Sequence, residues 1–320
     1  MLALIWDGQA LRRETNYAYP GLRDGHALVK VSLAGICSTD LQIFRGYMDF
    51  RGVPGHEFVG RVRAGPDPWL GQRVVGEINF ACGRCEFCRR DLGRHCPNRS
   101  VMGISKADGA FAEYVSIPVA NLHEVPLNVS DEEAVFTEPL AAAFEILEQV
   151  SINPADEILV LGDGKLGFLC AQVLKLACAH VTVVGKHARK LDAIRRCGIR
   201  TMLLNEWKPN SFDLVVEATG AASGLPLALG AVRPRGTLVL KSTIAEEHHA
   251  SLASLVIDEI TLVGSRCGPF AEALGALADR CVSVTPLIER IYPLADGVDA
   301  ARHASRPGAR KILLRCLTET

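Results

Sequence analysis

The chain has 320 residues, of which 48% are hydrophobic and 22% charged. This composition excludes a disordered chain, and the length suggests two domains. Lysine and arginine number 35 against 36 aspartate and glutamate, for a net charge of −1. The basic excess of proteins that bind mainly nucleic acid or an anionic membrane is missing, so we expect neither partner and a small-molecule substrate instead.

No apolar run reaches the roughly 18 residues of a membrane span. Residues 1–7 lack a basic segment and meet Asp7 early, so we interpret them as a first strand and not as a signal peptide. We therefore expect a cytoplasmic location.

The first part of the chain, up to about residue 135, predicts a compact and mostly β domain. Apolar and polar residues alternate with a period near two, and Pro-Gly, Gly-Pro and Asp-Gly turn pairs separate the runs. The predicted strands cover 27–33, 58–62, 73–78 and 111–117.

The pattern changes at Ser130, which with Glu133 resembles a capping box. We predict a helix there that Pro139 interrupts and that resumes over 141–150. Strands and helices then alternate, which is typical of a parallel, doubly wound α/β sheet. The predicted strands are 157–161, 180–184, 201–204, 213–217, 236–240, 261–264 and a closing 311–316, and the predicted helices are 166–177, 190–197, 271–278 and 298–303.

A glycine-rich turn follows the strand predicted at 157–161. Gly162, Gly164 and Gly167 form G-x-G-x-x-G between a strand and a helix, the context that a dinucleotide site requires. Lys165 and Leu166 begin the helix, whose free amides favour a pyrophosphate. The alternative is an ordinary strand-to-helix turn.

The end of the next strand distinguishes NAD from NADP. An NAD site places an acidic residue there, about 20 residues after the first glycine. This chain has no acid at that point, and basic side chains would bind a 2′-phosphate, so we predict NADP(H) in preference to NAD(H). The predicted contacts are Gly185, Lys186, His187, Arg189 and Lys190, together with Thr219 and Gly220 beyond the strand at 213–217. The alternative is that Lys186 and Arg189 only solvate the start of a helix.

Four of the eleven cysteines lie within fifteen residues: Cys82, Cys85, Cys88 and Cys96. Four thiolates can close a tetrahedral shell, as in structural zinc sites. The alternative is an iron–sulfur cluster, but the bacterial ferredoxin run has a last gap of three residues. Here that gap is seven residues, which favours zinc.

A second set of possible ligands lies at Cys37, His56 and Glu57, with Glu138 at the expected domain boundary. Cysteine, histidine and glutamate are all zinc ligands in proteins. Each alone is unremarkable, but together they suggest a catalytic metal.

These motifs, in this order, resemble the zinc-dependent medium-chain alcohol dehydrogenases, in the branch of threonine, sorbitol and glucose dehydrogenases. The resemblance rests on G-I-C-x-T-D, G-H-E, the four-cysteine lobe, T-E-P-L and G-x-G-x-x-G. It implies a GroES-like, mostly β catalytic domain over 1–138, completed by 269–320, and a Rossmann domain over 139–268. It also implies a homodimer or homotetramer.

By the same resemblance, Cys37 and His56 are ligands of a catalytic zinc, and the four-cysteine lobe holds a second zinc. Either Glu57 or Glu138 completes the catalytic site, and the resemblance leaves that choice open. Asp40 would hold the imidazole of His56, and the hydroxyl of Thr39 would contact the substrate oxygen. Gln42 departs from the family, which often has a titratable histidine there for proton relay.

The predicted function is zinc-dependent transfer of a hydride between NADP(H) and an alcohol or polyol, or the matching carbonyl compound. One alternative is a zinc-free NADPH quinone or enoyl reductase of the same superfamily. Another is a protein that senses NADPH without turnover. The sequence leaves the substrate, the direction of reaction and the proton route open.

Overall fold

The computed structural model describes residues 1–208, 211–244 and 250–316. Contacts divide the chain into two compact units. The first unit combines Met1–Glu138 with Leu287–Thr320, and the second is Pro139–Pro286. Among the described residues, no helix is long and apolar enough to cross a membrane.

The first unit is built on an almost entirely antiparallel sheet. Its strand order is β10-β5-β4-β3-β18-β17, and β9 also pairs with β3. Among the described pairs of this sheet, β17 and β18 alone run parallel to each other. The strands are β3 (His26–Gly35), β4 (Glu57–Ala64), β5 (Arg73–Gly76), β9 (Tyr114–Pro118), β10 (Leu122–Glu124), β17 (Ile288–Pro293) and β18 (Lys311–Arg315).

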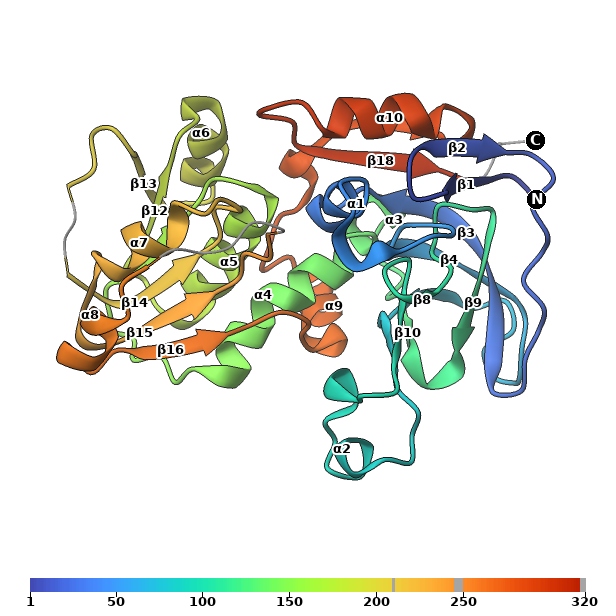
Figure 1. The fold of residues 1–320 in the computed structure, drawn as a ribbon, viewed down its shortest axis with the longest axis horizontal. Coiled ribbons are helices and arrows are strands. Elements are labelled where there is room, and N and C mark those ends of the chain that lie inside the picture. Colours follow the sequence, from blue (N-terminus) through green and yellow to red (C-terminus); the bar gives the residue numbers. More distant parts are fainter. Residues whose placement is uncertain (209–210, 245–249, 317–320) are drawn as a thin grey trace. The chain divides into compact units, whose positions relative to one another are not determined.

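Shorter elements surround this sheet (Figure 1). Two small sheets are formed by β1 (Ala3–Trp6) with β2 (Leu11–Glu14), and by β6 (Asn79–Phe80), β7 (Ser100–Met102) and β8 (Lys106–Ala107). The α-helices are α1 (Ser38–Ile43), α2 (Glu86–Arg89), α3 (Asp131–Ala134) and α10 (Gly297–Ala304).

The second unit contains a six-stranded parallel sheet in the order β13-β12-β11-β14-β15-β16. This is the 3-2-1-4-5-6 order of a doubly wound dinucleotide-binding fold, whose ligands bind at the carboxyl ends of the strands. Its strands are β11 (Ile158–Leu161), β12 (Val181–Gly185), β13 (Arg200–Leu203), β14 (Phe212–Glu217), β15 (Val232–Leu240) and β16 (Thr261–Gly264). Its helices are α5 (Lys165–Ala177), α6 (Ala188–Arg196), α7 (Gly224–Leu229), α8 (Ala253–Ile257) and α9 (Phe270–Ala278).

The predicted interruption of a helix at Pro139 is wrong. Ser130 does cap a helix, and its hydroxyl accepts from the amide of Glu133, but that helix is the short α3. A separate helix, α4 (Thr137–Gln149), then begins, and Pro139 lies in its first turn. Proline is tolerated there because the first amides of a helix have no acceptor within it.

The contacts place the return to the first unit at Leu287, later than the boundary expected after residue 268. Gln172 of α5 explains part of this difference. Its side-chain amide donates to the carbonyl of Ser283 at 3.0 Å and accepts from the amide of Ser283 at 2.8 Å. The segment that follows α9 is thereby attached to the second unit.

We predict that Gln172→Ala destabilises the second unit by about 1–3 kcal/mol, because two backbone groups of Ser283 lose their partner. Thermal and urea unfolding of the full chain measures the loss. Gln149→Ala is the control, since Gln149 is exposed and makes one bond, to Gly264. An equal effect of both substitutions would contradict the assigned role of Gln172.

Candidate metal centres and coenzyme site

The pairing of β3 with β4 brings Cys37 and His56 together. Gly35 and Glu57 are opposite each other in the register of these strands. Cys37 follows the end of β3, and His56 precedes β4, so the two meet at one end of the strand pair. One ligand atom each from Cys37, His56 and Glu57 lies within 4.8 Å of the others. The structure thus assembles three of the four residues predicted for a catalytic metal.

Asp40 organises two members of this group. It is fully buried, its Oδ2 accepts from the amide of Cys37 at 2.7 Å, and its Oδ1 lies 3.3 Å from Nδ1 of His56. Burial by itself lowers the pKa of His56, but the charge of Asp40 outweighs it and raises the pKa well above the usual value. The contact leaves the other ring nitrogen of His56 available to a metal.

Glu57 forms a buried ion pair with Lys311, the first residue of β18. The Nζ of Lys311 donates to Oε2 of Glu57 and lies 3.4 Å from the carbonyl oxygen of Ile36. Burial disfavours the charged lysine, but the carboxylate of Glu57 and the thiol group of Cys37 outweigh this effect and raise the pKa of Lys311. A Cβ on Gly35 would lie 2.3 Å from Oε2, so glycine is needed there.

The other oxygen of Glu57 has no hydrogen-bond partner among the described residues, although it is buried. Buried carboxylate oxygens in native proteins normally have a partner. Glu57, a member of the close group with Cys37 and His56, therefore has one oxygen that a bound cation would satisfy.

The remaining predicted residues lie near the group or outside it. The hydroxyl oxygen of Thr39 is 3.8 Å from the sulfur of Cys37. Gln42 is half-buried within α1. Glu138, the second residue of α4, is half-buried and does not belong to the set whose ligand atoms lie within 4.8 Å of one another.

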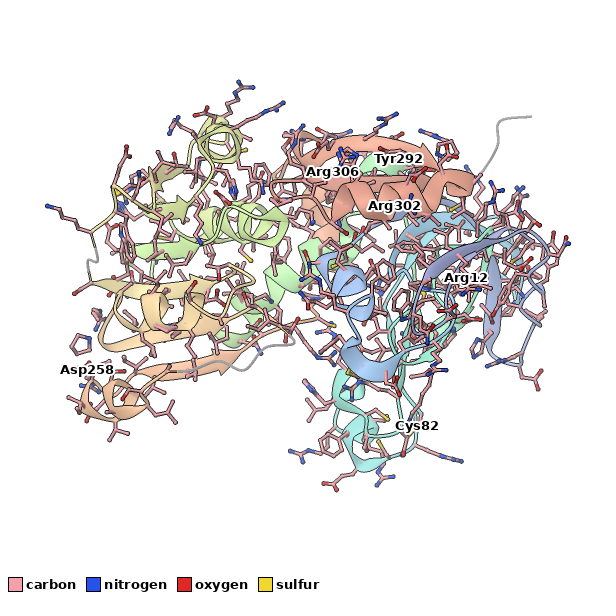
Figure 2. All side chains as sticks on the ribbon, turned by 45° about the horizontal axis from the view of Figure 1, so that its top comes forward. Arg12, Cys82, Asp258, Tyr292, Arg302 and Arg306 are labelled. Carbon is pink, nitrogen blue, oxygen red and sulfur yellow. The ribbon has the colours of Figure 1, made fainter. Side chains whose placement is uncertain are left out.

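The four predicted cysteines converge in a lobe around α2, where Figure 2 labels Cys82. The Sγ–Sγ distances are 3.4 Å from Cys85 to Cys88, 3.7 Å from Cys85 to Cys96 and 4.0 Å from Cys82 to Cys88. A single zinc with Zn–S bonds near 2.3 Å places its sulfurs about 3.8 Å apart. All four cysteines are free, and the spacing suits one tetrahedral ion.

Two thiols of the lobe have shifted pKa values. The backbone amides of Arg84 and Cys85 lower the pKa of Cys82 to about 6. Desolvation and the neighbouring thiols raise the pKa of Cys88 to about 11. The lowered pKa of Cys82 favours its thiolate, the form that binds metals.

The glycine-rich turn has the geometry of a phosphate site. Gly162 has φ +120°, and a Cβ on Gly167 would lie 2.1 Å from the carbonyl oxygen of Gly162. Nothing lies within 4 Å of a Cβ position on Gly164, the N-cap of α5, so that face is open. The amides of Leu166 and Gly167 have no acceptor among the described residues, as expected in the first turn of a helix.

The end of β12 gathers the predicted basic residues. Lys186, His187 and Arg189 are exposed, and Lys190 is half-buried in α6. Within the described residues, the side chains of Lys186 and Arg189 make no hydrogen bond or ion pair. Gly185 ends the strand itself.

Thr219 and Gly220 follow β14 at the carboxyl edge of the sheet. The amide and hydroxyl of Thr219 both donate to Oε1 of the buried Glu217. The amide of Gly220 donates to the hydroxyl oxygen of Ser242 at 2.8 Å. This loop is therefore held in one shape by the ends of β14 and β15.

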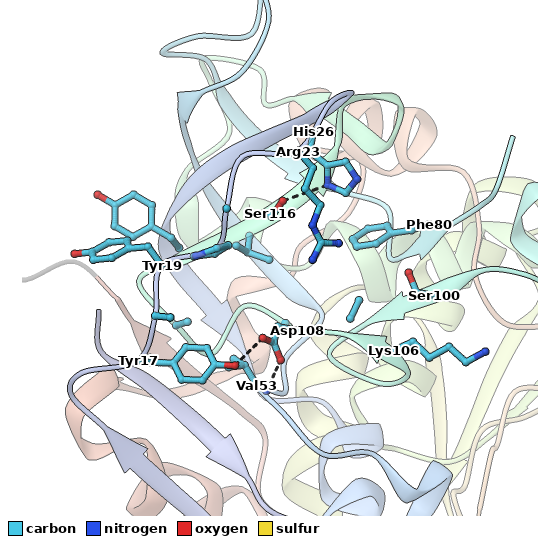
Figure 3. A pocket seen from close by; sticks show the side chains of 18 of the residues that line it. Tyr17, Tyr19, Arg23, His26, Val53, Phe80, Ser100, Lys106, Asp108 and Ser116 are labelled. Atoms are coloured by element: carbon cyan, nitrogen blue, oxygen red, sulfur yellow. Dashed lines mark hydrogen bonds between the residues drawn. The ribbon is translucent and has the colours of Figure 1, made fainter.

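A cavity of about 640 Å³ in the first unit contains none of these groups (Figure 3). In it Tyr17 donates to Asp108 at 2.8 Å, and His26 lies 3.2 Å from Ser116. Burial and Asp108 raise the pKa of Tyr17 to about 12. Burial and then the charge of Arg23 lower the pKa of His26. Tyr17 and His26 are thus neutral at neutral pH and bonded to their neighbours, so we assign them no part in catalysis.

Comparison with known proteins agrees with this architecture. Residues 23–127 match the model of the alcohol dehydrogenase GroES-like domain, and residues 166–283 match the zinc-binding dehydrogenase model. D-arabinitol dehydrogenase 1 of Uromyces fabae is 30% identical over 88% of this chain and 87% of its own. Sorbitol dehydrogenase of Halalkalibacterium halodurans is 29% identical over 89% of this chain and 90% of its own. An alcohol dehydrogenase from Thermus sp. ATN1 has a similar structure, with a TM-score of 0.88, 28% identity and coverage of 98% and 99%.

The chain belongs to the zinc-type medium-chain alcohol dehydrogenases. It is an alcohol dehydrogenase, and its predicted fold class, a GroES-like domain with a Rossmann domain, is confirmed. Membership of this family implies zinc, a nicotinamide coenzyme and a small-molecule alcohol substrate.

Three buried residues of this alcohol dehydrogenase were not predicted for its sites: Lys311, Glu217 and Asp163. Lys311 precedes an apolar run that reads only as a strand. Glu217 ends a predicted strand but was not considered as a support for the next loop. Asp163 lies between Gly162 and Gly164 of the glycine motif. That position was the one feature of the sequence that could have pointed to it.

We predict that Lys311→Met destabilises the first unit by about 3–5 kcal/mol, because it leaves Glu57 buried and unpaired. Adding Glu57→Gln should recover most of this loss, as measured by thermal and chemical unfolding. Arg315→Met on the same strand is the control, since its ion pair with Glu132 is exposed. Equal losses for Lys311→Met and Arg315→Met would contradict the buried pair.

Proposed function

We propose that this alcohol dehydrogenase is zinc-dependent and transfers a hydride between NADP(H) and an alcohol or polyol, or the matching carbonyl compound. The observation that carries the proposal is the close group of half-buried Cys37 with buried His56 and Glu57, in which one oxygen of Glu57 has no hydrogen-bond partner among the described residues. The similarity to arabinitol and sorbitol dehydrogenases supports a polyol as the substrate class.

Cys37, His56 and Glu57 would hold the catalytic zinc, and their thiolate, imidazole and carboxylate are suitable donors. Bound there, zinc supplies Lewis acidity toward the oxygen of the substrate. Glu57 is our choice over Glu138 for the carboxylate that binds the metal directly, because only Glu57 belongs to the close group. Cys82, Cys85, Cys88 and Cys96 would hold the second, structural zinc.

The surrounding residues orient these ligands. Asp40 fixes the imidazole of His56 and the backbone of Cys37. Lys311 pairs with Glu57 and so holds that carboxylate in place within the ligand group. The hydroxyl of Thr39, beside the sulfur of Cys37, can donate a hydrogen bond to that oxygen.

Gln42 lies where the family often has a histidine, and its side chain does not titrate. The proton of the substrate hydroxyl must therefore leave by another group. We propose that it passes from the hydroxyl of Thr39 through water or the ribose of the coenzyme, or to Glu138.

The second unit would bind the coenzyme along the carboxyl edge of its sheet. The open face at Gly164 and the amides of Leu166 and Gly167 would receive the pyrophosphate. Lys186, Arg189 and Lys190, with no acid at the end of β12, support NADP(H) over NAD(H). Thr219 and Gly220 would contact the nicotinamide half.

The ligand group of Cys37, His56 and Glu57 disfavours the two other candidate functions. A zinc-free quinone or enoyl reductase needs no such group, and neither does a sensor that only binds NADPH. Burying the charges of Asp40, Glu57 and Lys311 carries a desolvation cost. A protein that does not bind a metal at this place would have no need of them.

We also propose a homo-oligomer that forms through β16. This strand ends the sheet of the second unit, and Val256 and Ile257 of the adjacent α8 are 78% and 77% exposed. Exposed apolar side chains beside a free strand edge favour pairing with another copy.

We predict two zinc ions per chain and their separate loss in variants. Cys37→Ser should lose one zinc and all turnover but still bind NADPH, because the coenzyme residues lie in the second unit. Cys96→Ser should lose the other zinc and lower the melting temperature. Elemental analysis measures both, with the exposed Cys281→Ser as the control. Full turnover by Cys37→Ser would refute the catalytic assignment.

The choice of carboxylate has a matched test. Glu57→Gln should weaken retention of the catalytic zinc against a chelator, whereas Glu138→Gln should retain it. The reverse order would assign the metal to Glu138. Assays of polyols, sugars, hydroxy amino acids and simple alcohols with both coenzymes would identify the substrate.

Oligomer formation through β16 predicts that Ile257→Glu dissociates the protein, because a charge would be buried at the interface. Light scattering after size exclusion measures the mass. Leu127→Glu, at a fully exposed position of the first unit, is the control. A mass unchanged by Ile257→Glu would place the interface elsewhere.

A further inference from the structure

Asp163 is a buried carboxylate within the glycine-rich turn, where the pyrophosphate site has no use for an acid. Its side chain is 8% exposed. Its Oδ2 accepts from the amide of His187 at 2.6 Å, and its Oδ1 lies 3.0 Å from Nδ1 of the same residue. Asp163 therefore links the turn after β11 to the turn after β12.

Asp163 also occupies the space beside the end of β12. A Cβ on Gly185 would lie 2.5 Å from both Cβ and Oδ2 of Asp163. No side chain fits at residue 185 while Asp163 keeps this position. Dinucleotide folds that bind NAD place an acid at the end of this strand. Here a carboxylate from the glycine turn lies at that strand end.

The hydrogen bond fixes the orientation of the imidazole of His187. An ionised carboxylate only accepts, so Nδ1 of His187 is the donor to Asp163. The remaining nitrogen, Nε2, belongs to a ring that is 47% exposed. Both ring nitrogens donate in a charged imidazole, so with Nδ1 directed at Asp163, Nε2 is the nitrogen left to donate to an anion.

The surroundings of His187 suit a phosphate. His187 is the N-cap of the nine-residue helix α6, and the amides of Ala188 and Arg189 have no acceptor within the described part of the chain. Free amides at a helix start favour anions. The side chains of Lys186 and Arg189, which have no partner in the described structure, add two positive charges.

We propose that Asp163 and His187 select the coenzyme: Asp163 is a positioning residue that holds His187 so that its Nε2 binds the 2′-phosphate of NADP(H). This inference rests on the proposed preference for NADP(H). A carboxylate so close to a phosphate would repel it if both faced the same space. Asp163 is instead buried and directs its oxygens to His187, so its charge acts through the imidazole.

The test measures binding and not turnover. Calorimetry of the full zinc-loaded chain gives dissociation constants for NADPH, NADH, adenosine 2′,5′-bisphosphate and 5′-AMP. The variants are Asp163→Asn and His187→Ala. Asp192→Asn is the matched control. Like Asp163→Asn it removes one negative charge, but from an exposed carboxylate on α6 that pairs with Arg195. Circular dichroism and melting temperature confirm that each variant is folded.

Both Asp163→Asn and His187→Ala should weaken NADPH and the 2′,5′-bisphosphate about tenfold, the effect of losing a hydrogen bond to a charged group. Binding of NADH and 5′-AMP should change less than about twofold, and Asp192→Asn should bind all four ligands like the wild type. Tighter NADPH binding by Asp163→Asn would show repulsion and overturn the inference. Equal weakening of NADPH and NADH would also overturn it, because Asp163 would then only shape the turn.

The affinities of the wild-type protein for NADPH and NADH test the proposed preference for NADP(H) separately from the role of Asp163. If it binds NADH more tightly than NADPH, the preference for NADP(H) fails and the inference fails with it. If it prefers NADPH but Asp163→Asn keeps wild-type affinities, only the role of Asp163 fails.

Discussion

Four chargeable side chains, Asp40, His56, Glu57 and Lys311, are buried together in the first unit, and each is compensated by a neighbour. An isolated charge in such a place would cost several kcal/mol, so none of them can be changed alone without consequence for the others. The arrangement orients the imidazole and leaves one buried oxygen of Glu57 without a hydrogen-bond partner among the described residues. This mutual compensation allows a charged site to exist in the buried interior of the first unit.

The same arrangement explains why the chain returns to its first unit. Lys311 begins β18, which pairs with β3 through Leu313 and Gly35. The residue that compensates Glu57 therefore comes from a segment 254 positions later in the chain. A chain that ended after the six-stranded sheet would leave the carboxylate of Glu57 buried and unpaired. The last segment is thus part of the site as well as part of the sheet.

Signals that are local in the sequence were predictive. The strand expected at 261–264 has those bounds in the structure, and the four cysteines converge as their spacing indicated. The pairing of Lys311 with Glu57 could not be predicted, because it depends on the register of strands far apart in the chain. The prediction at Pro139 was wrong for a different reason. Proline breaks a helix in its interior but not in its first turn, and the sequence did not show that a new helix begins at Thr137, two residues before Pro139. The sequence could not decide whether Glu57 or Glu138 is the metal ligand, because the distance of each carboxylate from Cys37 depends on how the chain folds. A role for Glu138 stays a prediction.

The crowding between Asp163 and Gly185 has a consequence for how this lineage could change over time. An acidic residue at position 185 would collide with the side chain of Asp163. An acidic residue that changes the coenzyme preference at position 185 would therefore fit only after residue 163 had become smaller. If residue 185 changed first, its side chain would collide with Asp163. Because a side chain at 185 and that of Asp163 would occupy the same space, the effect of a substitution at 185 depends on the residue at 163.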